Sequence, residues 1–201
     1  MLGIETFFDG IDVKQLKRIA RLYGGLEAKF SDTHLYGCNA INRASRLDLH
    51  KGPSLQILDI GPAFGYFVRA CRLLGHHAEG LDMPHEMYEE ACSVMGVAVH
   101  RHTIRAREPL PEQVAGYDFI NMEGFGMPMR SPDERPNQDV LWTDWVYFIN
   151  DLLDRLNSKG RLAITLNYGR PWQERLRQWR EAFGTRADIT QDGNHFHLVL
   201  R

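Results

Sequence analysis

Short apolar runs alternate along this chain with longer segments that repeat apolar residues at helical spacing. The runs have the length of buried strands, and each helical segment has one apolar face. The pattern predicts strands over residues 55–60, 77–81, 97–102, 117–122 and 161–167, and helices over residues 66–74, 87–94, 140–156 and 173–183. This β-α order is typical of an α/β fold in which helices cover both faces of a mostly parallel sheet.

The longest helical segment and the end of the chain complete this pattern. Apolar residues recur at helical offsets at Leu141, Trp145, Phe148, Ile149, Leu152, Leu153 and Leu156. We expect this stripe to be core and the polar stretch 157–160 to end the helix. Two short strands follow over residues 185–191 and 195–201, around an Asp-Gly-Asn turn signal. This hairpin brings the number of predicted strands to seven.

The hydrophobic pattern of the first fifty residues differs from the β-α alternation of the rest of the chain. Residues 11–26 and 40–49 look helical, and a polar connection over residues 29–34 separates them. Gly52 and Pro53 mark the entry to the first strand. We therefore expect residues 1–52 to form a small N-terminal helical cap on a core of residues 53–201, within one domain.

Composition places the chain among globular proteins of enzyme size. It has 201 residues, of which 43% are hydrophobic and 25% are charged, so it can bury a substantial core. The formal net charge of −2 gives no electrostatic footprint for nucleic acid, although a local basic patch could still exist. We therefore expect no nucleic-acid partner.

The N-terminal residues, the apolar stretches and the cysteines indicate in which compartment of the cell the protein is expected. The first nine residues contain acids and no basic flank, which is unlike a secretory signal, and no apolar stretch approaches membrane-spanning length. Cys38, Cys71 and Cys92 lie far apart, as expected for reduced thiols. We expect a cytoplasmic protein without a membrane partner, and the sequence carries no signal for its oligomeric state.

Residues 57–65 read I-L-D-I-G-P-A-F-G and join the first strand to an amphipathic helix. Glycine at such a corner can adopt positive φ and lets the backbone approach a ligand, while the first helical amides face that ligand unpaired. A dinucleotide fingerprint requires a small residue where Tyr66 stands. The stretch therefore predicts a nucleotide-like cofactor, and Tyr66 argues against a dinucleotide. An ordinary tight strand-helix turn of an α/β protein is the alternative interpretation.

This motif resembles the first motif of class I S-adenosylmethionine-dependent methyltransferases, in which an acidic and an apolar residue precede G-x-G-x-G. Asp59, Gly61 and Gly65 match it, whereas Ala63 replaces the middle glycine. The resemblance implies a three-layer Rossmann-like methyltransferase fold, with a mostly parallel seven-stranded sheet whose last strand is antiparallel. It also implies S-adenosylmethionine as the cofactor. It assigns to the cofactor site the residues Asp59, Gly61, Pro62, Ala63, Phe64 and Gly65.

Two further strand ends extend the implied cofactor site. The run 77–81 ends at Asp82, and the resemblance gives this carboxylate the ribose hydroxyls and Met83 the adenine face. Asp82 has an alternative interpretation as the N-cap of the next helix. At the exit of the fourth strand, the resemblance places Asn121 and Met122 near the amino-acid end of the cofactor.

Methyl transfer is an in-line displacement, so positioning supplies most of the catalysis, and a base is needed only when the acceptor must lose a proton. Glu123 and His85 stand where the fold would place such a base. The alternative interpretations are a loop-entry charge for Glu123 and a helix-entry surface residue for His85.

Substrate contacts are expected from the cap and from one loop. In this family such a cap folds over the cofactor, so His34, Tyr36 and Asn39 are candidates, with a polar connecting loop as the alternative. The proline-rich loop 124–139 carries Arg130, which could meet an anionic acceptor.

Two histidine pairs raise the question of a metal. His100 and His102, and likewise His195 and His197, share one side of a strand. No Asp, Glu or Cys evidently completes either set, so we expect no metal.

Three functions from different classes remain open. The leading hypothesis is methylation of a small molecule or a sugar, at oxygen. A cofactor-binding or scaffolding protein of the same fold without turnover is the second. A nucleotide-dependent oxidoreductase is the third, and Tyr66 and the closing hairpin count against it.

Overall fold

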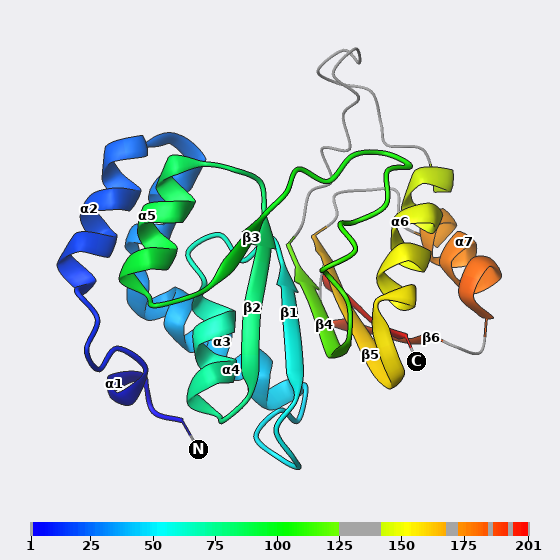
Figure 1. Cartoon of the computed structure of the whole chain (residues 1–201), viewed down its shortest axis with the longest axis horizontal. Coiled ribbons are helices and arrows are strands. Elements are labelled where there is room, and N and C mark those ends of the chain that lie inside the picture. Colours follow the sequence, from blue (N-terminus) through cyan, green and yellow to red (C-terminus); the bar gives the residue numbers. More distant parts are fainter. Residues whose placement is uncertain (1, 125–141, 168–172, 185–186, 193–194, 201) are drawn as a thin grey trace. The chain divides into compact units, whose positions relative to one another are not determined.

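The computed structural model describes residues 2–124, 142–167, 173–184, 187–192 and 195–200 (Figure 1). The chain divides into two compact units, Met1–His102 and Thr103–Arg201. Each unit combines strands with helices, as the alternating pattern predicts.

The first unit contains three parallel strands. They are β1 (Gln56–Ile60), β2 (His77–Asp82) and β3 (Val99–Arg101), in the order β3-β2-β1. Its helices are α1 (Ile4–Phe7), α2 (Val13–Tyr23), the 3-10 helix η1 (Gly25–Ser31), α3 (Thr33–Arg46), α4 (Tyr66–Leu73) and α5 (Glu86–Val94). The last four residues of β1 are all buried, which is typical of a parallel strand covered on both faces.

Pairs of helices in the first unit are far apart in sequence and packed in space. Helix α3 packs against α4, and α2 packs against α5 (Figure 1). Helix α2 buries Leu16, Ile19 and Ala20, which share one face. The N-terminal helices therefore pack directly on the helices that flank β1 and β2.

The second unit contains β4 (Tyr117–Glu123), α6 (Trp142–Asp154), β5 (Leu156–Asn167), α7 (Gln173–Phe183), β6 (Ala187–Asp192) and β7 (His195–Leu200). Strands β4 and β5 are parallel, while β7 lies between β5 and β6 and is antiparallel to both. The predicted antiparallel last strand and the predicted hairpin are confirmed.

The apolar stripe of the long helix is confirmed in part, and the predicted end of the helix is wrong. Trp145, Phe148, Ile149 and Leu152 are buried, and Leu153 is half-buried. Leu156 belongs to β5, and Leu141 lies outside the described residues. Helix α6 ends at Asp154, and the polar stretch 157–160 belongs to β5 instead of ending the helix. The register of β5 against β4 shifts there, since Tyr117 pairs with Leu156 and Phe119 with Arg161, so the register passes over residues 157–160.

The polar connection predicted between the N-terminal helices is largely helical. Helix α3 begins at Thr33, because the Asp32 side chain accepts a hydrogen bond from the Leu35 amide at 3.0 Å and caps the helix. His34, Tyr36 and Asn39 therefore lie on α3 and not in a loop. The division into a cap of residues 1–52 and a core of residues 53–201 stays a prediction.

No helix in the described ranges is both long enough and apolar enough to cross a membrane.

Candidate functional site

The loop between β1 and α4 has an alternating backbone conformation. Gly61, Ala63 and Gly65 have φ values of 71°, 50° and 77°, in the left-handed region. Glycine adopts this region freely, whereas the Cβ of alanine makes it cost about 1–2 kcal/mol. Ala63 therefore keeps the loop conformation that a middle glycine would adopt, at the expense of backbone strain.

Replacing Ala63 with glycine is expected to raise the free energy of unfolding by about 0.5–1 kcal/mol. Strain relief outweighs the extra freedom that glycine gives the unfolded chain. Thermal denaturation should show a midpoint higher by about 1–4 °C. Ala98→Gly is the matched control, because Ala98 is exposed and its φ is not positive, so glycine there should lower the midpoint. Equal shifts in both variants would contradict strain at Ala63.

Both backbone groups of Ala63 are held by side chains. Its amide donates to Asp82 Oδ2 at 3.0 Å, and its carbonyl accepts from the Cys92 thiol at 3.1 Å. Burial raises the pKa of Cys92 to about 12, so the thiol stays protonated and remains a donor at neutral pH. These two contacts tie the loop to β2 and to α5.

A glycine in β2 makes room for the loop. A Cβ added at Gly80 would lie 2.5 Å from Cγ of Pro62. Real Cβ atoms essentially never lie that close to another heavy atom. The Pro62 ring is buried and cannot swing away as a flexible side chain would. Gly80 was not identified from the sequence, although a glycine inside a predicted strand is a recognised sign of close approach.

Asp82 ends β2 and faces the loop. Besides the Ala63 amide on Oδ2, its Oδ1 accepts from the Met83 amide at 2.8 Å. Burial raises the pKa of Asp82, while these two donors and the charges of Arg101 and His85 oppose that rise. Each carboxylate oxygen has two lone pairs, so a further acceptor site remains on each.

The alternative role of Asp82 as a helix cap is wrong. The N-cap of α5 is His85, whose Nδ1 accepts from the Met87 amide at 3.3 Å. Asp82 is therefore available for another partner.

An exposed apolar side chain follows this carboxylate in the sequence. Met83 follows Asp82, and 44% of its surface is exposed, which is high for a large apolar residue. Among the described residues no side chain caps the N-terminus of α4, where Gly65 stands at the N-cap. The first unit thus combines unpaired helix amides, an acceptor carboxylate and an exposed thioether around one strand-to-helix corner.

Phe64 is a structural residue of the loop. Its side chain is fully buried, and its ring stacks on Phe30 at 4.8 Å and lies parallel to Tyr66 at 6.3 Å. The Tyr66 hydroxyl donates to the Phe30 carbonyl at 3.4 Å, and burial raises the Tyr66 pKa above its ordinary value. Tyr36 joins the cluster 4.9 Å from Phe30. Phe64 can therefore reach a ligand only through its backbone.

The other predicted cofactor residues differ in exposure. Asp59 in β1 is buried. In the second unit, Asn121 and Met122 are also buried, so the backbone at the end of β4 is the part available to a ligand. Their proximity to a cofactor stays a prediction.

The two candidate bases differ in their surroundings. His85 uses Nδ1 to cap α5, so its neutral ring carries the proton on Nε2, and the ring lies 5.8 Å from Tyr23 and 5.0 Å from Tyr88. Glu123 is exposed at the end of β4 in the second unit. His85 does stand at a helix entry, as its alternative interpretation has it, although its side chain is half-buried and caps the helix. A role of either residue as a base stays a prediction.

The candidate substrate residues also differ in the exposure of their side chains. On α3, His34 and Asn39 are exposed, whereas Tyr36 is half-buried in the aromatic cluster. Arg130 lies outside the described residues. Contact of these residues with a substrate therefore stays a prediction.

For metals, the described ranges contain no group of three His, Cys, Asp or Glu side chains that could hold an ion. His100 Nε2 in β3 lies 3.1 Å from Glu79 Oε1 in β2, but the two atoms are not in hydrogen-bonding geometry. The side chains of His195 and His197 are not among those that the structure describes.

Comparison with known proteins gives structural matches only. No protein-family model and no curated protein matches the chain. Many solved structures do match. One is a DhpI–SAH complex, at 15% identity and a TM-score of 0.58, covering 96% of this chain and 97% of that one. The chain has the fold of S-adenosylmethionine-dependent methyltransferases.

Two further structures share this methyltransferase fold. A putative S-adenosylmethionine-dependent methyltransferase from Methanococcus maripaludis is 14% identical, with a TM-score of 0.58 and coverage of 94% of this chain and 90% of that one. A 16S rRNA N2 methyltransferase from T. thermophilus, in complex with AdoMet and guanosine, is 17% identical, with a TM-score of 0.53 and coverage of 83% and 42%. The predicted fold class is confirmed.

Proposed function

We propose that the protein is an S-adenosylmethionine-dependent methyltransferase. The observation that carries the proposal is the 61–65 loop, in which every second residue has positive φ and whose Ala63 amide is bound to Asp82 at 3.0 Å. The fold supports it, since titles of two structural neighbours name AdoMet or SAH as the bound molecule.

The residues of the first unit fit this cofactor chemically. The loop backbone from Gly61 to Gly65 and the uncapped start of α4 offer N–H donors. The free lone pairs of Asp82 would accept the ribose hydroxyls, and exposed Met83 would pack against the adenine ring. When bound, the cofactor supplies an electrophilic methyl group on a sulfonium. The chain's part is to hold the acceptor in line with that methyl group and to exclude water.

We further propose that the acceptor is a small molecule or a sugar and that transfer is to oxygen. Glu123 is the better candidate for the base that removes the acceptor proton, because His85 already uses Nδ1 in capping. The fold itself does not choose the acceptor, since the T. thermophilus neighbour is named for an rRNA. His34, Tyr36, Asn39 and Arg130 remain proposed contacts, and a cytoplasmic location remains a proposal that rests on three free cysteines.

Cofactor affinity is expected to fall as the pH is lowered through the pKa of Asp82. The ionised carboxylate accepts both ribose hydroxyls, whereas the protonated form loses acceptor capacity. Burial raises this pKa above its ordinary value of 3.8, so the loss should begin at a higher pH than for an exposed aspartate. Calorimetric titration with S-adenosylhomocysteine at decreasing pH measures it. Asp82→Asn should show a flatter profile, and identical profiles would argue against this role of Asp82.

The proposal is tested by calorimetric titration of the protein with S-adenosylmethionine, S-adenosylhomocysteine and NAD in parallel. Binding of the first two and not of NAD supports the proposed cofactor and leads to a radiolabelled methyl-transfer screen of alcohols, phenols and sugars. Binding without transfer to any acceptor would favour the second candidate, a cofactor-binding protein without turnover. Ala63 in place of the middle glycine of the motif is the observation that favours that candidate. Binding of NAD alone would favour an oxidoreductase.

A further inference from the structure

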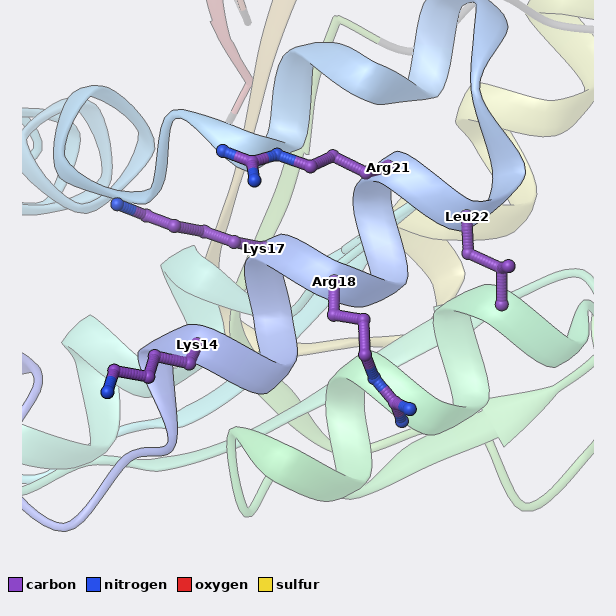
Figure 2. Close-up of a pocket in the computed structure, with 5 residues that line it drawn as sticks. All are labelled: Lys14, Lys17, Arg18, Arg21 and Leu22. Carbon is purple, nitrogen blue, oxygen red and sulfur yellow. The ribbon is translucent and has the colours of Figure 1, made fainter.

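Helix α2 has a cationic stripe on its exposed side, which we define as Lys14, Lys17 and Arg21. The stripe and Arg18 and Leu22 line a groove of about 450 Å³ (Figure 2). In Figure 2 the three stripe residues extend to one side of α2, whereas Arg18 extends toward α5. Offsets of three and four residues keep the stripe on one face of the helix.

The stripe is not neutralised by the side chains that the structure describes. Arg18 has an acidic partner, with its Nη2 3.6 Å from Glu90 Oε1 on α5. Lys14, Lys17 and Arg21 have no ion pair within the described part of the chain. Like charges three and four residues apart destabilise a helix, so an external anion would relieve this repulsion.

The packing of α2 argues against a membrane surface as that anion. An interfacial helix inserts its apolar face between lipids. The apolar face of α2, formed by Leu16, Ile19 and Ala20, is buried within the first unit. Among the described residues of α2, the exposed large apolar side chains are Leu22, with 75% of its surface exposed, and Tyr23, with 40%.

The residue types of the stripe argue against a protein partner. Protein interfaces have apolar and aromatic centres and are depleted of lysine. Interfaces with nucleic acid are strongly positive and polar, and their cations follow the phosphate backbone. The helical rise separates neighbouring stripe residues by about 4.5 and 6 Å along the axis, so each can meet a different phosphate.

We propose that the stripe of α2 binds the phosphate backbone of a single-stranded nucleic acid. The net charge of −2 averages over the whole chain and hides this local patch. The inference is independent of the proposed methyl transfer, because it rests on α2 and uses no residue of the β1–α4 loop.

Fluorescence anisotropy of the full chain with a labelled oligouridylate, measured over a series of salt concentrations, tests the proposal. Three phosphate contacts predict a slope of about −2 for log affinity against log salt. Changing Lys14, Lys17 and Arg21 together to alanine should weaken binding about tenfold or more at low salt and remove most of that slope. A labelled oligodeoxythymidylate of the same length tells whether the 2′-hydroxyl contributes.

The matched control carries Arg46→Ala, Lys51→Ala and Lys159→Ala, which remove the same charge from exposed positions elsewhere. It should bind like the wild type, and circular dichroism should show that both variants fold. Absence of oligonucleotide binding by the wild type at low salt would overturn the proposal, as would equal losses in the two variants. Equal competition by polyglutamate would point to an acidic protein instead, and co-sedimentation with anionic vesicles in place of oligonucleotide binding would point to a membrane.

Discussion

Replacing Phe64 with alanine is expected to lower the free energy of unfolding by about 3–5 kcal/mol. The Phe64 ring is fully buried and stacks on Phe30 from the N-terminal region, so its removal leaves a cavity under the β1–α4 loop. Chemical denaturation of the purified variant measures the loss. Because the loop rests on this ring, the variant should also bind S-adenosylhomocysteine more weakly.

Two controls separate packing from other effects of this substitution. Phe64→Leu keeps most of the volume and should cost clearly less than alanine. Leu35→Ala removes an exposed apolar side chain on α3 and should change stability by no more than about 0.5 kcal/mol. A loss below about 1 kcal/mol for Phe64→Ala would show that the cluster does not support the loop.

Replacing Asp82 with alanine is expected to weaken S-adenosylmethionine binding by about 1–3 kcal/mol, which is roughly 5- to 150-fold in Kd. The variant removes the acceptor for the ribose hydroxyls, and it also removes the acceptor of the Ala63 amide. Calorimetric titration measures the affinity. An unchanged Kd would contradict the assignment of Asp82.

A comparison of ligands distinguishes the ribose contact from support of the loop. The wild type should bind S-adenosylhomocysteine more tightly than its 2′-deoxy analogue, because only the former offers both hydroxyls to Asp82. In Asp82→Ala this preference should disappear, whereas a purely supporting role would weaken both ligands equally. Glu108→Ala removes an exposed acid that is paired with Arg105, and it should leave both affinities unchanged.

The strand and helix positions were largely predictable because they depend on local periodicity. The β1, β2 and β4 runs, and four residues of the α6 stripe, occupy the positions that their apolar spacing predicts. The errors lie where tertiary pairing competes with local signals. Residues 157–160 have turn chemistry, but they lie within β5, where the register against β4 passes from Leu156 to Arg161. The helical start at Thr33 was missed because a single capping side chain, Asp32, decides it.

The sequence by itself determined the class of fold and the place of the cofactor loop, because a strand, a glycine turn and a helix in series are local features of residues 56–73. Only the tertiary structure decided how that loop is held. The contacts of Ala63 with Asp82 and Cys92, and of Phe64 with Phe30, join residues distant along the chain, and no local pattern encodes such distances. It also decided which cations of α2 have no acidic partner among the described residues, since helical spacing shows a shared face but not the acid that packs opposite it.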